Sequence, residues 1–432
     1  MYDYEFGSDH TNFTMRLLWI TNVELPEIAK YYKRETVLGG WMDSMARQLA
    51  AIKTIDLHVI CPLVKEKYVS TQVNGIAYSN FLQEDAENEI LNLIRQYNPD
   101  IVHIWGTEYP HALAAINAVT RAKLLGRTVV SIQGLVSFIA QHYTAGLPEK
   151  IVNHRTIKEM LGRPNLNDSR REMERLGKRE REVLQKAKHC IGRTDWDYAC
   201  VKQMNPKIHY HFCNETLRAV FYESVWNYEN CEKNTIFFSQ AHYPLKGLHH
   251  MLQALVIVRQ YYPSVKLRVV GKDYFNYNSI VDKMKLSTYQ KYIIKYVKEY
   301  NLMQNIEWVG TLDAEQMKNQ YCKANVFVCA SSIENSSNSV GEAMLLGMPV
   351  VASDVGGIKS YMQHEKEGIL YQESAPYMLA DGIMRFFSDK EYAKKTGENA
   401  RKRAMATHNE AKNLDTLLNI YAYLMENQEN AR

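Results

Sequence analysis

The stretch from Val328 to Gly357 constrains the fold of this chain most strongly. An apolar run from Asn325 to Ala330 leads into it and predicts a buried parallel strand. A loop rich in serine and asparagine follows, and then a short helix that ends at Gly347-Met348-Pro349, after which Val350 begins a second strand. This β-loop-α-β unit places its loop at the carboxyl end of a strand, where open α/β sheets bind ligands.

Two glutamates bracket this loop. Glu334 is expected at the tip of the strand and Glu342 in the first turn of the helix. Between them, the backbone N–H groups of Asn338, Ser339 and Val340 form a site suited to phosphate, because the first amides of a helix have no partner within it. Carboxylates that hold hydroxyls and amides that hold an anion together fit a sugar-containing diphosphate. An ordinary loop, in which Glu342 complements the helix dipole, fits the two glutamates equally well.

The residues around the glutamates carry a family resemblance. Glu-x7-Glu, followed by Gly-Met-Pro-Val-Val-Ala-Ser and Gly356-Gly357, resembles the donor-site motif of the family 4 retaining glycosyltransferases (glycosyl transferases group 1), which have the GT-B fold. The resemblance implies that Glu334 contacts donor-sugar hydroxyls and Glu342 the ribose. This chain departs from the family at 335–337, where Asn-Ser-Ser replaces the usual Gly-Phe-Gly or Gly-Phe-Pro.

Length and composition fit an ordinary globular protein of two domains. The chain has 432 residues, 46% of them hydrophobic and 23% charged, with a net charge of +4 that is too small to indicate nucleic acid. Seven scattered cysteines without a C-x-x-C pair predict free thiols in a reducing cytoplasm. The polar start of the chain does not resemble a secretory signal, and no apolar run has the length of a membrane span.

The first half alternates strand and helix patterns. Apolar runs such as Arg16 to Thr21 and Asp100 to Trp105 are each followed by a loop and a helical segment, which predicts a parallel, Rossmann-like sheet. Gly39-Gly40 opens the first of these helices and allows the backbone to approach a ligand closely. Its position resembles the glycine-rich loop that faces the donor in the GT-B amino-terminal domain. A plain turn is the alternative.

Four polar residues are expected at the carboxyl ends of the first domain's strands. His103, Glu108 and His111 surround one strand end, and Arg193 follows the last strand, where it either pairs with Asp195 or reaches an anionic group. We expect Glu108 to orient or deprotonate the acceptor hydroxyl. His103, His111 and Arg193 are expected to contact the acceptor or a phosphate. Capping of the next helix by Glu108, with His111 in solvent, is the alternative.

The family's second histidine in a His-x-His pair is replaced here by Trp105, so that role is not carried over.

The second domain is expected to bind the donor phosphates through Lys246, which precedes Gly247 and a helix. The pair resembles the family's Arg…Lys-Gly motif, although Ala241 stands where the family usually has the arginine. A solvated loop lysine is the alternative. By the same resemblance, Val309 and Gly310 flank the nucleotide base.

Residues 150–193 form a strongly basic, helical segment. A solvated helix face with Glu–Arg pairs explains it. Contact with anionic lipid, where a lipid-linked acceptor would be found, is the other interpretation.

Together these patterns predict an α/β protein of the GT-B fold, with two Rossmann-like domains facing across a cleft. Residues 1–221 are expected to form the acceptor domain, 222–408 the nucleotide-sugar donor domain, and 409–432 a helix that packs back on the first domain.

The expected function is retaining transfer of a sugar from a nucleotide-diphosphate sugar to a glycan or lipid-linked hydroxyl acceptor in bacterial cell-surface polysaccharide synthesis. The site is expected in the cytoplasm or at the inner face of the membrane, without metal, other cofactor or nucleic acid. A GT-B epimerase or phosphorylase, or a nucleotide-sugar binder with impaired catalysis, are the alternatives. UDP and GDP both remain open.

Overall fold

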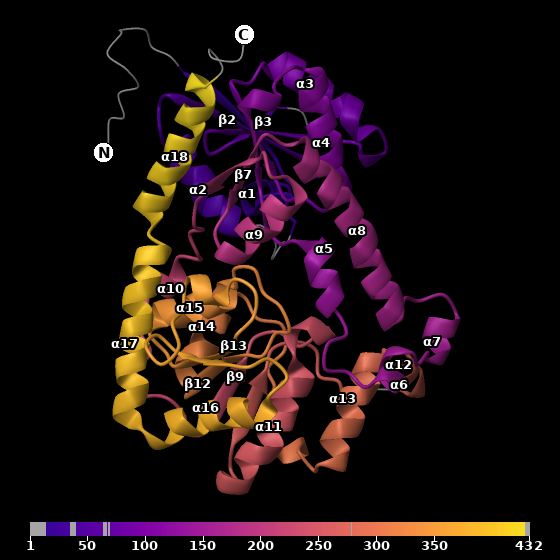
Figure 1. The fold of residues 1–432 in the computed structure, drawn as a ribbon, viewed down its shortest axis with the longest axis vertical. Helices are drawn as coiled ribbons and strands as arrows, with labels where there is room; N and C mark the ends of the chain where they lie inside the picture. Colours follow the sequence, from indigo (N-terminus) through magenta and orange to yellow (C-terminus); the bar gives the residue numbers. More distant parts are fainter. Residues whose placement is uncertain (1–13, 35–39, 64–66, 68–69, 278, 428–432) are drawn as a thin grey trace.

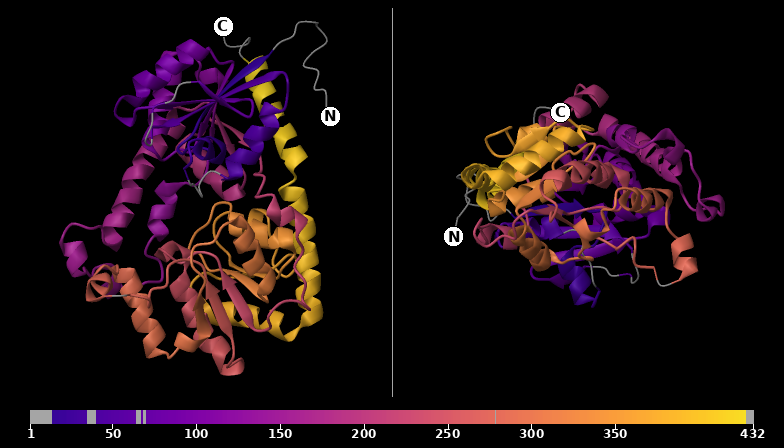
Figure 2. Two further views of the ribbon diagram at one scale, coloured as in Figure 1. Left: turned by 180° about the vertical axis from the view of Figure 1, so that it is seen from behind. Right: turned by 90° about the horizontal axis from the view of Figure 1, so that it is seen from below.

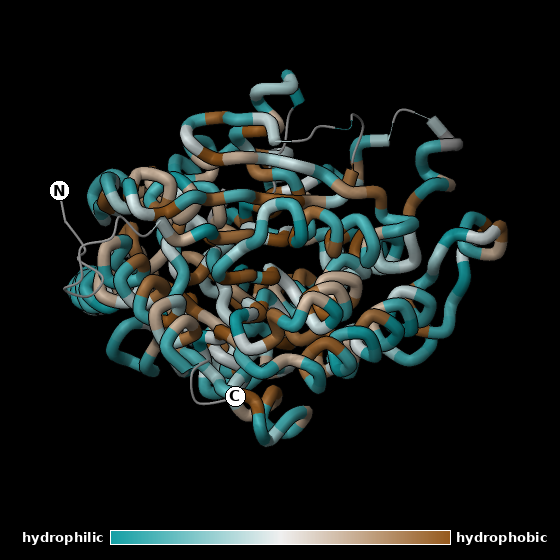
Figure 3. The backbone as a smooth tube through the Cα atoms, turned by 90° about the horizontal axis from the view of Figure 1, so that it is seen from above, coloured by the Kyte–Doolittle hydropathy of each residue, from teal (hydrophilic) through white to brown (hydrophobic). Residues whose placement is uncertain are grey.

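Two parallel sheets dominate the computed structural model, which describes residues 14–34, 40–63, 67, 70–277 and 279–427 (Figure 1). Each sheet is covered by helices on both faces, as buried parallel strands require because both of their faces are apolar. Figure 3 shows the same distribution, with hydrophobic segments inside and hydrophilic turns outside.

The amino-terminal sheet has the strand order β3-β4-β2-β1-β5-β6-β7-β8, and only β3 runs antiparallel to its neighbour. Its strands are Met15–Ile20 (β1), Ile55–Pro62 (β2), Thr71–Val73 (β3), Ile76–Phe81 (β4), Ile101–Trp105 (β5), Thr128–Ser131 (β6), His189–Gly192 (β7) and His209–Phe212 (β8). Its helices are Pro26–Tyr31 (α1), Gly40–Ala50 (α2), Ala86–Tyr97 (α3), Pro110–Arg121 (α4), Val136–Ile139 (α5), Glu149–Val152 (α6), Ile157–Met160 (α7), Leu166–Lys186 (α8) and Asp195–Met204 (α9).

The carboxy-terminal sheet has the order β11-β10-β9-β12-β13-β14, with every neighbouring pair parallel. Its strands are Thr235–Phe238 (β9), Lys266–Val269 (β10), Ile306–Trp308 (β11), Val326–Cys329 (β12), Val350–Ser353 (β13) and Ile369–Tyr371 (β14). Its helices are Val220–Glu223 (α10), Leu248–Tyr261 (α11), Ile280–Met284 (α12), Thr288–Glu299 (α13), Ala314–Lys323 (α14), Asn338–Leu346 (α15) and Pro376–Ser388 (α16).

Two long helices, Lys390–Thr407 (α17) and Glu410–Glu426 (α18), end the described chain and run along one side of the molecule (Figures 1 and 2). The apolar face of α18 packs in the core of the amino-terminal domain through Leu417, Leu418 and Leu424. Tyr421 of the same helix accepts a hydrogen bond from Trp19 Nε1 at 3.1 Å. The end of the chain therefore joins the second domain back to the first.

A second connection lies on the opposite side of the molecule, where residues 140–165 reach from the first domain to the second (Figure 1). Glu159 of α7 accepts hydrogen bonds from Thr288 N at 3.0 Å and Thr288 Oγ1 at 2.6 Å, at the start of α13. His249 Nε2 lies 3.1 Å from the carbonyl oxygen of Ala145. The two domains are thus held together on both sides.

Candidate functional site

The centre of the candidate site is an ion pair between Lys246 and Glu334. Lys246 Nζ lies 2.7 Å from Glu334 Oε1, which also accepts a hydrogen bond from Ser331 Oγ at 2.7 Å. The two residues follow the neighbouring strands β9 and β12, so both lie at the carboxyl edge in the middle of the sheet. Burial lowers the pKa of Lys246, but the Glu334 carboxylate more than compensates and the pKa is raised above its ordinary value. Lys246 is therefore a fixed cation.

Gly247 sets the distance between the two loops that carry this pair. Its φ is +72°, and a Cβ atom there would lie 1.8 Å from the carbonyl oxygen of Ala330. Ser332 N donates to the carbonyl oxygen of Leu245 at 2.8 Å and fastens the loops together. Only glycine permits this approach.

Gly356 and Gly357 support the Glu334 loop from the other side. Cβ atoms at these positions would lie 2.0 Å from Glu334 O and 2.2 Å from Asn335 O, respectively. Gly357 N donates to Glu334 O at 3.0 Å. The Gly-Gly pair thus fixes the backbone that carries the glutamate.

Asn335, one of the residues that depart from the family motif, contacts the other domain. Thr194 Oγ1 donates to Asn335 Oδ1 at 2.9 Å, and Asp195 N donates to Ser360 Oγ at 3.0 Å beside it. The departure from the motif therefore coincides with a point at which α9 of the amino-terminal domain touches the Glu334 loop.

The amino-terminal end of α15 faces the same pocket. The helix begins at Asn338, so the N–H groups of Asn338, Ser339 and Val340 are its first three donors and have no acceptor within the helix. Ser339 lines a small pocket together with Lys246 and Glu334, whereas the Val340 side chain is buried in the core. Amides and a lysine therefore converge beside one carboxylate.

Glu342 does not lie where the sequence predicted. Because α15 begins at Asn338, Glu342 lies in its second turn and points inward, where it is 4% exposed. Both carboxylate oxygens are bound by Arg218, with Nε–Oε1 at 2.7 Å and Nη2–Oε2 at 2.8 Å. Burial raises the pKa of Glu342, and Arg218 opposes that rise. Glu342 therefore does not complement the helix dipole, and any ribose contact has to compete with Arg218.

Arg218 was not found by sequence reasoning, because it lies in the segment between β8 and α10 without a motif around it. Replacing Arg218 by methionine is expected to destabilise the fold by about 2–4 kcal/mol, since it leaves a buried carboxylate unpaired. Thermal unfolding measures the loss. The double variant Arg218→Met/Glu342→Met should regain most of it, and a double variant no more stable than the single one would contradict this account.

The remaining donor-site predictions lie at the edges of this region or outside it. Gly39 lies outside the described residues, and Gly40 begins α2. Val309 and Gly310 follow the edge strand β11, where Gly310 pairs with Gly271 at the end of β10 and has open space where a Cβ would be. That open space leaves room for a flat group at the carboxyl edge.

Glu108 lies at the facing edge of the amino-terminal sheet. Its Oε2 accepts a hydrogen bond from Thr107 N at 3.0 Å, and burial raises the pKa of the carboxyl group. Burial, then Glu108 and the phenol of Tyr243, raise the pKa of the neighbouring Tyr109. Tyr243 immediately precedes the 3-10 turn of Lys246, so Tyr109 lies near the start of that turn across the domain boundary.

A second buried carboxylate stands behind Glu108, and sequence reasoning missed it. Glu180 of α8 accepts hydrogen bonds from Val136 N at 2.9 Å and Ser137 N at 3.0 Å, and lies 3.3 Å from Thr107 Oγ1. Burial raises the pKa of Glu180 to about 7. In the sequence it is one charge among many in a basic helix, so no pattern distinguished it.

Both predicted histidines are buried and hydrogen-bonded inside the amino-terminal domain. His103 is fully buried, with Nδ1 2.7 Å from Tyr421 Oη and Nε2 2.6 Å from Ser131 Oγ, and burial lowers its pKa to about 3. His111 is also buried rather than solvated, with Nε2 2.9 Å from the carbonyl oxygen of Trp105. Their geometry is that of packing residues, and we do not carry them into the proposed site.

Arg193 pairs with Glu215 rather than with Asp195. Its Nη1 lies 2.6 Å from Glu215 Oε2, and its Nη2 donates to the carbonyl oxygen of Ile132 at 2.8 Å. The buried guanidinium thus joins β7 to the segment that crosses between the domains, and its charge is already compensated.

Within the described ranges, no three His, Cys, Asp or Glu side chains lie together as metal ligands do. In the same part of the chain, no helix combines the length and apolar character needed to cross a bilayer.

Comparison with known proteins agrees with this geometry. Residues 226–403, which contain Lys246, Glu334 and Glu342, match the family model of the glycosyl transferases group 1. This chain carries a glycosyl transferases group 1 domain. The group 1 domain includes the whole carboxy-terminal sheet and α15.

The sequence relatives cover only part of the chain. The putative glycosyltransferase YtcC of Bacillus subtilis is 29% identical over 192 residues, which is 43% of this chain and 45% of YtcC. Spore coat protein SA of the same organism is 25% identical over 181 residues, 41% of this chain and 45% of its own. The chain's match thus spans less than half the length of these relatives.

The structural neighbours cover nearly all of the chain. Sucrose-phosphate synthase from Thermosynechococcus elongatus superimposes with a TM-score of 0.66 and 16% identity over 95% of this chain and 99% of its own. Anabaena HepE, solved in complex with UDP-glucose, gives a TM-score of 0.65 and 14% identity over 95% of this chain and 100% of its own. At these identities the likeness establishes the GT-B fold alone.

Proposed function

We propose that this protein transfers a glycosyl group from a nucleotide-diphosphate sugar to a hydroxyl acceptor. The observation that carries the proposal is the Lys246–Glu334 ion pair beside the first amides of α15, within the group 1 domain. A fixed cation and free amides suit a diphosphate, and the carboxylate suits sugar hydroxyls.

In the ligand-free arrangement the lysine and the glutamate neutralise each other. On this proposal the donor diphosphate takes over Lys246 and the amides of Asn338 and Ser339, which releases Glu334 to accept hydrogen bonds from the sugar. Charge on the leaving diphosphate is then stabilised by Lys246 and the α15 dipole, with no metal required.

We further infer that the reaction is of the family 4, retaining type. Glu334 orients the sugar without becoming a nucleophile, and the acceptor hydroxyl attacks from the face that the diphosphate leaves. Glu108 is the proposed acceptor base, because burial raises its pKa toward the range in which a carboxylate accepts a proton. Its place just past the carboxyl end of β5 supports that role.

The acceptor belongs to the same proposal. A glycan or a lipid-linked hydroxyl in cell-surface polysaccharide synthesis, met at the inner face of the membrane, suits a GT-B enzyme with a basic segment at 150–193. HepE was solved with UDP-glucose, which makes a UDP-sugar the first donor to test.

Thermal unfolding with UDP, GDP and the corresponding sugar nucleotides tests the proposal. A ligand at about 100 times its Kd should stabilise the protein by about 2.7 kcal/mol. We expect one nucleoside diphosphate to raise the melting temperature of the wild type and to raise that of Lys246→Met clearly less. Absence of a shift with every nucleotide would contradict donor binding.

A companion assay separates the enzyme classes. Incubation with donor alone, followed by product analysis, should show no epimer and no phosphate-dependent cleavage, whereas the epimerase and phosphorylase alternatives require one of them. Donor binding without turnover on any hydroxyl acceptor would instead favour an impaired binder.

A further inference from the structure

The short helix α7 exposes apolar side chains at the outer edge of the molecule. Ile157, Met160 and Leu161 have exposed fractions of 54%, 64% and 81%. Their spacing of three and four residues puts them on one face of the turn. The inward side of the same turn is fixed by Glu159, which is buried and bonded to Thr288. The outward direction of the apolar face is therefore set by the fold.

This turn is one of the parts farthest from α17 and α18. It lies at the edge opposite these helices in Figure 1 and in the reverse view of Figure 2. In Figure 3 the same edge carries a projecting turn with hydrophobic colouring. Apolar side chains on a projecting turn are suited to insertion, because nothing else in the fold shields them from a flat surface.

Positive charge from the other domain adjoins the turn. Lys158 Nζ donates to the carbonyl oxygen of Lys285 at 2.6 Å, which ties α7 to the segment between α12 and α13. Burial first, and then repulsion from Arg163, Lys285 and Lys272, lower the pKa of Lys158. Cations of the two domains thus crowd together at this point.

Beyond that contact, the charge continues along α12 and α13. An open groove there has Leu286 and Ile294 among its walls, and its charged lining residues are Lys283, Lys291, Lys295, Lys298 and Glu299. Three of the lysines recur on α13 at spacings of four and three residues, so they share one face of the helix. Met284 beside them is 46% exposed. The groove therefore combines cations with an apolar lining, as a phospholipid headgroup and the first part of its chains require.

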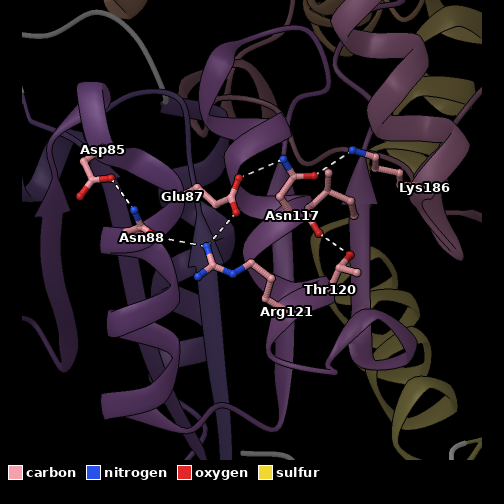
Figure 4. Close-up of polar contacts among 8 residues, drawn as sticks. Asp85, Glu87, Asn88, Asn117, Thr120, Arg121 and Lys186 are labelled. Atoms are coloured by element: carbon pink, nitrogen blue, oxygen red, sulfur yellow. Dashed lines mark hydrogen bonds and ion pairs between the residues drawn. The ribbon is translucent and has the colours of Figure 1, made fainter.

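The basic helix α8 is organised differently. Leu166–Lys186 contains seven basic and five acidic residues, and several of its cations are paired within the helix: Arg170 with Glu174, Arg175 with Glu172, and Lys186 with Glu182. Lys186 also donates to Asn117 Oδ1 at 2.9 Å, in the polar network between α3, α4 and α8 (Figure 4). Many of its cations are thus paired with acidic residues of the same helix, so the lipid contact inferred for 150–193 narrows to the α7 end of that range.

We propose that Ile157, Met160, Leu161 and Met284, with Lys283, Lys291, Lys295 and Lys298, form a tip surface that binds the face of an anionic lipid bilayer. Each lysine is attracted to the negative leaflet, and the apolar side chains enter the headgroup region. This inference goes beyond the proposed function, because it requires neither donor nor acceptor. Since the surface is built from both domains across the Glu159–Thr288 contact, binding would also hold the two domains in their present arrangement.

Vesicle co-sedimentation of the full chain tests the tip surface. We expect binding to phosphatidylcholine vesicles that contain about 30% phosphatidylglycerol, and little binding to phosphatidylcholine alone. Lys291→Glu/Lys295→Glu should weaken binding at least about 30-fold, because each lysine contributes about a fivefold factor near an anionic surface. Met160→Ser/Leu161→Ser should weaken it about 10-fold, through lost apolar insertion.

The matched control is Arg170→Glu/Arg171→Glu on α8, which changes the net charge by the same amount at a half-buried and an exposed position. It should alter vesicle binding by less than about threefold. The proposal would be overturned if the control and tip variants lost vesicle affinity equally, or if the protein bound neutral vesicles as well as anionic ones. It would also be overturned if the lysine surface bound RNA and the protein did not bind vesicles. Melting temperatures equal to that of the wild type would show that the variants are folded. An unchanged rise in melting temperature with nucleotide would show that donor binding is intact, which keeps this test separate from the test of glycosyl transfer.

Discussion

Lys246→Met is expected to lower kcat/KM for glycosyl transfer by about 10²- to 10³-fold. The lysine is the cation closest to Glu334, and without it a carboxylate that is only 11% exposed faces the incoming diphosphate. Nucleotide affinity should fall by at least about 10-fold, as expected for loss of a charged hydrogen bond. Steady-state kinetics with the donor found by thermal shift, and calorimetry with the nucleoside diphosphate, measure the two effects.

A double variant distinguishes two roles of the lysine. If Lys246 serves only to neutralise Glu334, then Lys246→Met/Glu334→Gln should recover both stability and nucleotide affinity. If Lys246 binds the diphosphate, as proposed, the double variant should regain the stability lost with the ion pair, about 1–3 kcal/mol. Its affinity for the nucleotide should nevertheless remain low. Full recovery of affinity would rule out the phosphate role.

Gly247→Ala is expected to have the largest effect on stability, about 2–5 kcal/mol. Alanine at φ +72° costs about 1–2 kcal/mol, and relief of the contact between its Cβ and Ala330 O costs about 1–3 kcal/mol more. The loops of Lys246 and Glu334 have to separate, so nucleotide binding should fall even in the molecules that remain folded. Thermal unfolding with and without nucleotide measures both.

The control for this variant is Gly162→Ala. Gly162 also has a positive φ, +97°, but a Cβ there meets nothing within 4 Å. Gly162→Ala should lose only the stability that a positive φ costs an alanine, and its nucleotide binding should be unchanged. If the two alanine variants proved equally stable, close packing between the two loops would not be the reason for glycine at 247.

The sequence predicted the parallel sheets well because buried parallel strands are continuous apolar runs, visible without any partner. Val326–Cys329 and Val350–Ser353 are of this kind. The short β3, with intermediate and exposed residues, carried no such pattern and was missed. Likewise, the chain around Lys246, Glu334 and Gly356-Gly357 could be assigned to one pocket, since loops that follow parallel strands lie at one edge of the sheet and these residues resemble the family's donor-site motifs.

Side-chain partners were less predictable. Arg193 was expected either to pair with Asp195 or to reach an anionic group, yet its partner is Glu215. Glu342 was expected near the start of a helix, and its partner is Arg218, 124 residues away. Such pairs form between distant segments that packing brings together, so no local spacing encodes them.

By itself, the sequence determined the alternating α/β architecture and the loop where a lysine, a glutamate and free amides meet, because both depend on the order of residues along short segments. The tertiary structure alone decided which charges remain available. Packing occupied Glu342, Arg193 and His103 with internal partners. It turned the apolar face of α7 and two lysines of α13, Lys295 and Lys298, toward solvent. The physical reason is that a buried charge or polar group requires a partner, and the fold determines which distant side chain supplies it.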